Sequence, residues 1–153
     1  MYKYRVDVTR VVDGDTVDVD IDLGFGMTYK KQRVRLYGID TPESRTRDLV
    51  EKKYGKAAKK FLQEKIESAK VVTLYSHDKG KFGRILGELF VSNGDNPVLT
   101  EDRVSVNQQM INDYHAVKYT GENKDTTEQR HLEHRNLLLE NGTVTQEQVD
   151  EVS

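Results

Sequence analysis

Three stretches in the first forty residues place apolar side chains at every second position, and this alternation constrains the fold more than any other feature. Residues 2–8, 17–21 and 29–39 follow it. A period of two is typical of a β-strand with one buried face. The turn at Asp13-Gly14-Asp15 and the glycines at positions 24 and 26 separate the three runs. We therefore expect three consecutive antiparallel strands.

The period changes after the third run. Residues 51–69 carry apolar side chains at three- and four-residue spacing, which predicts an amphipathic helix. Two more strands are expected at 71–75 and 84–91. Further helices are expected at 104–113 and 127–139, the second because Thr126 and Gln129 have the spacing of a capping box.

Five short strands with one helix between the third and the fourth predict an α+β fold. The simplest architecture of this kind is a five-stranded OB-fold β-barrel with about three helices, a fold that frequently binds oligonucleotides. At 153 residues the chain has the length of one domain, which we place at residues 1–140. Residues 141–153 are polar and acidic, so a flexible tail is expected there.

The composition excludes several classes of protein. The chain has no cysteine, so disulfide frameworks, zinc–thiolate sites and a cysteine nucleophile are ruled out. No apolar run approaches the roughly 18 residues that would cross a bilayer. The residues after Met1 are polar and aromatic, not those of a signal peptide. We expect a soluble, cytoplasmic monomer without membrane contacts.

The charge is unevenly distributed. The net charge is −2, but residues 29–84 carry 16 basic and 7 acidic side chains, while the segments on both sides are acidic. A basic central segment favours a polyanionic partner such as DNA or RNA. A lysine-rich helix face that meets only solvent would give the same distribution.

Two short segments concentrate oxygen ligands. They are Asp13-Gly14-Asp15-Thr16 and Asp40-Thr41-Pro42-Glu43. Carboxylates with hydroxyl or carbonyl oxygens, and without His or Cys, favour Ca²⁺ or Mg²⁺. Taken singly, each segment is also ordinary turn or helix-start chemistry. Arg35 and Arg84 add guanidinium groups that can hold phosphate oxygens, so the set suits phosphodiester chemistry.

Together, these segments resemble the staphylococcal nuclease (thermonuclease) family. The resemblance lies in the order and spacing of four motifs across about residues 4–114. They are Val12-Asp13-Gly14-Asp15-Thr16, Arg33-Val34-Arg35-Leu36-Tyr37-Gly38-Ile39-Asp40-Thr41-Pro42-Glu43, Tyr54-Gly55-Lys56-Ala57-Ala58 and Phe82-Gly83-Arg84. The resemblance implies an OB barrel and calcium-dependent hydrolysis of DNA and RNA phosphodiesters with little sequence specificity.

The resemblance also implies roles for single residues. Asp15, Asp40 and the Thr41 carbonyl would bind one Ca²⁺ ion, with Asp13 close to it through water. Glu43 would act as general base, and Arg35 and Arg84 would contact the scissile phosphate. The substrate-stacking tyrosines of the family have no clean counterpart here. The residues that we expect to contact the substrate in their place are Lys81, Phe82, Tyr114 and Tyr119.

Two other functions are compatible with the same sequence features. A nucleic-acid-binding module of the same fold, weak or inactive in catalysis, is the first alternative, and a protein-interaction module is the second. Loss of a carboxylate or of either arginine would indicate the first alternative, and none is lost. The second would not need the carboxylates and arginines that are present. His131 and His134 are one helical turn apart without an evident third metal ligand, so we interpret them as surface residues.

Overall fold

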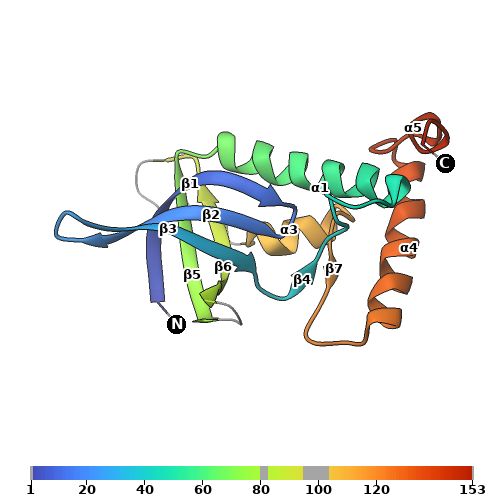
Figure 1. Ribbon diagram of the computed structural model, residues 1–153. Helices are drawn as coiled ribbons and strands as arrows, with labels where there is room; N and C mark the ends of the chain where they lie inside the picture. The colour runs from blue at the N-terminus through green and yellow to red at the C-terminus, as the bar shows by residue number, and fades with distance from the viewer. Residues whose placement is uncertain (1, 80–82, 95–103, 153) are drawn as a thin grey trace.

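The computed structural model describes residues 2–79, 83–94 and 104–152, and its centre is a closed β-barrel (Figure 1). The barrel strands are β1 (Tyr2–Asp13), β2 (Thr16–Gly24), β3 (Met27–Leu36), β5 (Val71–Lys79) and β6 (Ile85–Ser92). Two short strands, β4 (Ile39–Asp40) and β7 (Val117–Lys118), pair outside the barrel. The helices are α1 (Leu49–Glu67), α3 (Val106–Asn112), α4 (Lys124–Glu140) and α5 (Gln146–Asp150).

The strand order confirms the predicted barrel. The barrel runs β1-β2-β3-β6-β5 and closes through the antiparallel pairing of β1 with β5. β1, β2 and β3 form the expected antiparallel meander. The sheet is mixed because β3 pairs with β6 in parallel. This parallel contact places the end of β3 beside the start of β6, and so brings Arg35 near Arg84.

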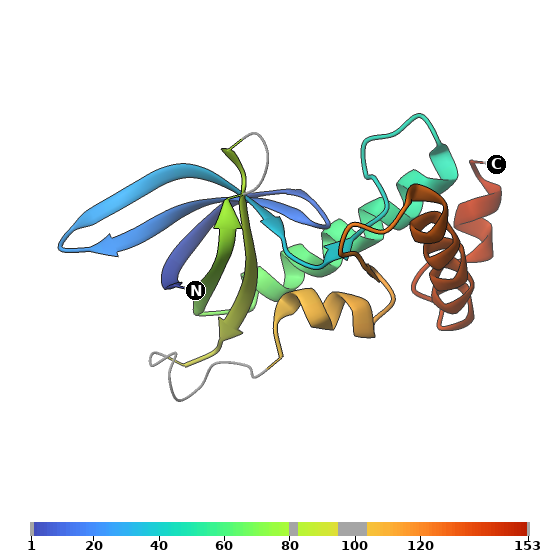
Figure 2. The same ribbon diagram turned by 90° about the horizontal axis from the view of Figure 1, so that it is seen from below.

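The barrel interior is built from the alternating residues of the strands. Val17, Val19 and Val34 are fully buried, which confirms the inward face expected from the sequence. α1 contributes Ala58 and Leu62, and α3 contributes Val106 and Met110 to the same core. In Figure 2, α1 runs from the barrel toward α4, with α3 beside it. The two helices therefore close the barrel with side chains that the strands do not supply.

The first helix begins two residues before the predicted start and ends two before the predicted end. Asp48 is its N-cap, since its carboxylate accepts hydrogen bonds from the amides of Val50 and Glu51. Its buried face includes Tyr54, Gly55, Ala58 and Leu62. The helix thereby joins the barrel core to a second apolar cluster at the far end of the molecule.

The second cluster is formed by Tyr54, Leu138 and Val144. Our predicted start for α4 was wrong: its N-cap is Asn123, whose side chain accepts from the Thr126 amide, so Thr126 lies inside the helix. The segment predicted to be a flexible tail contains α5, which begins with a capping box at Thr145. We had expected little burial there, yet Val144 is only 2% exposed. The domain limits themselves remain predictions.

The hairpin of β2 and β3 extends beyond the barrel (Figure 1). Its tip turns through positive φ angles at Gly24, Phe25 and Gly26, and Phe25 is fully exposed. Across residues 2–79, 83–94 and 104–152, no helix is both long and apolar enough to cross a membrane.

Candidate active site

The turn between β1 and β2 lies directly against α1 and the segment after β4. A Cβ added at Gly14 would come within 2.8 Å of the Ala58 Cβ and 3.0 Å of the Thr41 Oγ1, so only glycine fits without displacement. Asp13 fixes the same contact, because its carboxylate accepts from the Gly14 amide at 2.9 Å and from the Ser44 amide at 3.3 Å. Two segments far apart in sequence are thus held together at backbone level.

Arg35 links the two carboxylates that this arrangement brings together. Its Nη1 lies 3.1 Å from Asp15 Oδ2, and its Nη2 lies 3.3 Å from Asp40 Oδ1. Asp15 also accepts hydrogen bonds from the Thr16 hydroxyl at 2.9 Å and from the Thr41 amide at 3.3 Å. Asp15 and Asp40, both predicted to bind a metal, therefore lie on the two sides of the Arg35 guanidinium, and Thr41 contacts Asp15 through its amide.

The acidic groups of the site perturb one another. Burial raises the pKa of Asp15, and the neighbouring Asp40 and Asp13 raise it further against the opposing effect of Arg35. Burial likewise raises the pKa of Glu43, and the charges of Asp13 and Asp15 add to this effect. A cation bound among these carboxylates would stabilise their charged forms, so the arrangement favours binding of a cation.

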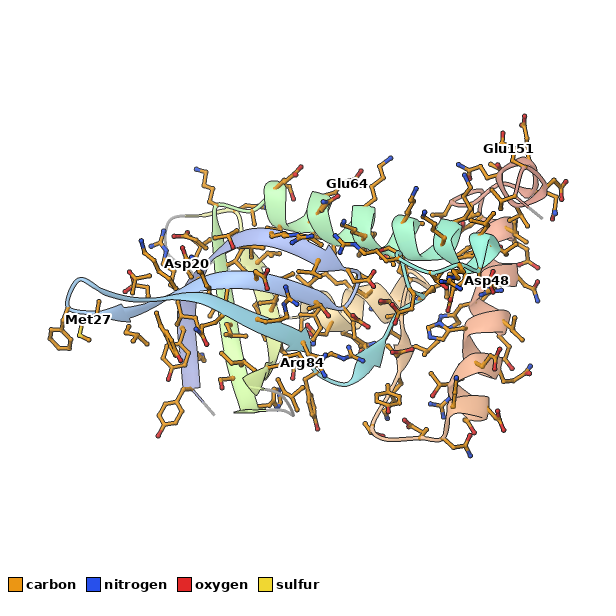
Figure 3. All side chains as sticks on the ribbon, viewed as in Figure 1. Asp20, Met27, Asp48, Glu64, Arg84 and Glu151 are labelled. Carbon is orange, nitrogen blue, oxygen red and sulfur yellow. The ribbon has the colours of Figure 1, made fainter. Side chains whose placement is uncertain are left out.

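These groups open into a cleft of about 890 Å³. Figure 3 shows Arg84 at the barrel end nearest β4 and Asp48 at the start of α1. β4 and β7 form the connection between barrel and helices, and α4 forms the wall opposite the barrel. The lining residues are Arg35, Asp40, Thr41, Glu43, Asp48, Glu51, Arg84, Leu86, Tyr119, Glu122, Lys124, Thr127, Glu128, His131, Leu132 and Arg135.

The contribution of α4 was missed from the sequence. Our interpretation of His131 as a surface residue was wrong, because its Nε2 lies 2.8 Å from Asp40 Oδ2 and its side chain is only 14% exposed. His134 is also packed inward, with its ring edge-on to that of Tyr114 at 5.5 Å. Burial is the main factor lowering the pKa of His134. In the sequence, only the spacing of His131 and His134 by one helical turn indicated that both side chains lie on one face of a helix.

The other predicted residues divide between the cleft and its surroundings. Tyr119 lines the cleft, whereas Tyr114 packs in the second apolar cluster with a positive φ of 67°. Asp13 lies behind the site, bound to the backbone of Ser44. Lys81 and Phe82 lie outside the described residues. The structure therefore gathers Arg35, Asp40, Thr41, Glu43, Arg84 and Tyr119 in one cleft, with Asp15 at its base beside Arg35.

Comparison with known proteins agrees with this arrangement. The family model described as "Staphylococcal nuclease homologue" matches residues 33–137. This range includes Arg35, Asp40, Glu43, Arg84 and the cleft-lining part of α4. The chain belongs to the staphylococcal nuclease family. The β1–β2 turn with Asp15 precedes the matched range, so its place in the site rests on the geometry described above.

Individual members of the staphylococcal nuclease family support the assignment. The thermonuclease of Staphylococcus intermedius is 36% identical over 85 residues, which are 55% of this chain and 47% of that protein. An uncharacterized endonuclease of Escherichia coli is 31% identical over 118 residues, 77% of this chain and 63% of that protein. The chain spans about half the length of the staphylococcal thermonucleases that it matches.

Proposed function

We propose that this protein is a metal-dependent nuclease that hydrolyses phosphodiester bonds of DNA or RNA with little sequence specificity. One observation carries the proposal. The guanidinium groups of Arg35 and Arg84 line one cleft with the carboxylates of Asp40 and Glu43, and burial raises the pKa of Glu43. Asp15 lies at the base of this cleft, beside Arg35. Family membership and the nuclease names of the relatives support the same activity.

The donor set fits a hard divalent cation, and Ca²⁺ is our proposal. Asp15, Asp40 and the main-chain carbonyl of Thr41 would hold it. Carboxylate and carbonyl oxygens are the ligands that Ca²⁺ prefers. In addition, the Thr41 Oγ1 is buried without a hydrogen-bond partner. No trio of acidic or histidine side chains is arranged for a metal within the residues that the structure describes, so main-chain oxygens would have to complete the shell.

A bound divalent ion would supply positive charge that polarises the phosphate. The protein's own residues account for the other requirements. Glu43 accepts a proton from the water whose oxygen attacks phosphorus, the ester P–O bond breaks as the new bond forms, and the leaving oxygen takes a proton from solvent water. Its raised pKa makes Glu43 a better proton acceptor than an ordinary glutamate. Arg35 and Arg84 stabilise the charge that develops on the phosphate oxygens.

The proposal is tested by cleavage of plasmid and of single-stranded DNA and RNA, with Ca²⁺ and then with excess EDTA. We expect cleavage with Ca²⁺ that stops in EDTA and does not depend on the sequence cut. Binding of the nucleic acid without cleavage under any metal condition would instead assign a binding module of the same fold. Failure to bind nucleic acid at all would contradict the proposal entirely.

A further inference from the structure

Arg135 is a cation of the cleft that the proposed chemistry does not use. It lies on α4, one turn after His131, and lines the same cleft as Arg35 and Arg84. It is thus placed on the wall opposite the barrel arginines. The family resemblance drawn from the motifs assigns it no role.

The environment of Arg135 fixes its guanidinium without neutralising it. Its Cζ lies 5.2 Å from the ring centroid of Tyr54, a side chain only 2% exposed. The Nε atom of Arg135 is buried and has no hydrogen-bond partner. Arg135 forms no ion pair with a carboxylate of the described residues. A guanidinium that lines a cleft and has no carboxylate partner among the described residues favours an anionic ligand.

Arg130, five residues earlier on the same helix, shows the opposite situation. Its Nη1 lies 3.4 Å from Glu122 Oε1 and donates to the Lys118 carbonyl at 2.9 Å. It does not line the cleft. The guanidinium of Arg35 is likewise paired with two carboxylates. Arg135 therefore differs from both, because it lines the cleft and forms no ion pair with a carboxylate of the described residues.

We propose that Arg135 binds a backbone phosphate of the nucleic acid strand next to the phosphate held by Arg35 and Arg84. This inference rests on the proposed function, since it assumes that the cleft holds a nucleic acid. The planar guanidinium presents paired N–H groups that match phosphate oxygens. A cleft of about 890 Å³ lies at the upper end of the sizes typical of ligand sites. We infer that it receives more than one nucleotide.

The first test is the salt dependence of binding to a fluorescently labelled oligothymidylate, measured by anisotropy with Ca²⁺ in a Glu43→Gln background that slows cleavage. Arg135→Gln should weaken binding and reduce the slope of log affinity against log salt by about 0.7, the value for one phosphate contact on a single strand. Arg130→Gln removes the same charge from the same helix and should leave the slope unchanged. Equal slopes in the two variants would overturn the proposal.

The second test uses substrate length, with Glu43 intact. A dinucleotide carries one phosphodiester and cannot occupy a neighbouring phosphate site. Arg135→Gln should therefore raise KM on an oligonucleotide several-fold and leave KM on the dinucleotide unchanged. An equal loss on both substrates would show that Arg135 only supports the fold. Arg135→Met keeps an apolar side chain beside Tyr54, removes the charge and serves in both tests if Arg135→Gln does not fold. If the parent protein binds no oligonucleotide, the proposed function fails as well as this inference.

Discussion

The two walls of the cleft are built by different means. The barrel wall comes from turns and strand ends, where Gly14, the Asp13 hydrogen bonds and the β3–β6 pairing fix the backbone. The helical wall comes from α4, whose cleft-facing side chains are polar apart from Leu132 and whose Leu138 packs with Tyr54 in the second apolar cluster. We therefore expect the proposed catalytic groups on the barrel wall, and on the helical wall groups that position them or bind the substrate.

The largest effect is expected on the barrel wall, at Glu43. Glu43→Gln removes the proton acceptor and should lower kcat by about 10²- to 10⁴-fold, the usual range for loss of a general base. Calcium affinity and oligonucleotide affinity should stay close to those of the parent protein. Single-turnover cleavage of a short oligonucleotide at saturating Ca²⁺ measures the effect. If the substitution changes only KM, Glu43 does not act as the general base.

Arg84 tests whether the barrel wall acts on the transition state. Arg84→Lys keeps the charge but loses the planar fork, so kcat should fall by about 10- to 100-fold with little change in KM. Steady-state kinetics on the same oligonucleotide gives both constants. The comparison of walls predicts the reverse pattern for Arg135, in KM alone. If Arg84→Lys also changes only KM, Arg84 binds the substrate phosphate equally in the ground state and the transition state. The two walls would then not differ in their contribution to catalysis.

His131 tests the positioning role of the helical wall. Its hydrogen bond holds one oxygen of Asp40, so His131→Gln should weaken Ca²⁺ binding by about 10- to 100-fold, as is usual for groups that orient metal ligands. Calorimetric titration of the metal gives the affinity independently of activity. His134→Gln is the matched control, since His134 lies on the same helix and contacts Tyr114 instead. Equal affinities in the two variants would leave Asp40 independent of α4.

The smallest expected effect is on the pH dependence of stability and comes from His115, in the segment that links the two walls. His115 joins α3 to β7, is 5% exposed and packs on Phe61. Burial lowers the pKa of His115, with Asp113 opposing the shift. The unfolded chain then binds a proton at His115 near its ordinary pKa of 6.5, while the folded protein does so only at lower pH.

The contribution of His115 to stability should therefore fall as the pH drops below about 6.5, because the unfolded state binds more protons at this residue there. His115→Gln should reduce the pH dependence of stability. It should not abolish it, since burial also lowers the pKa of His134. Urea unfolding at several pH values between 5 and 8 checks the sign. A variant with the same pH dependence as the parent protein would exclude His115 as a contributor.

The difference between the barrel wall and the helical wall also explains which parts of the fold and the site could be predicted from the sequence. The barrel strands follow a period of two over buried valines such as Val17, Val19 and Val34, so the fold was predictable from local pattern. Asp40, Thr41 and Glu43 are consecutive or nearly so, which made the barrel wall recognisable. The residues of α4 reach the site only through the docking of the helix. The contact between His131 and Asp40 spans 91 positions and has no local pattern to reveal it.

Gly55 has a consequence for how this chain can change over time. A Cβ at this position would overlap the backbone of Glu43 and Ser44, although Gly55 lies inside α1, where alanine would favour the helix by roughly 1 kcal/mol. The segment that carries Glu43, the proposed general base, therefore excludes the substitution of Gly55 by alanine that would stabilise the helix. Selection for heat resistance would have to act elsewhere, because the stabilising substitution at position 55 would displace Glu43.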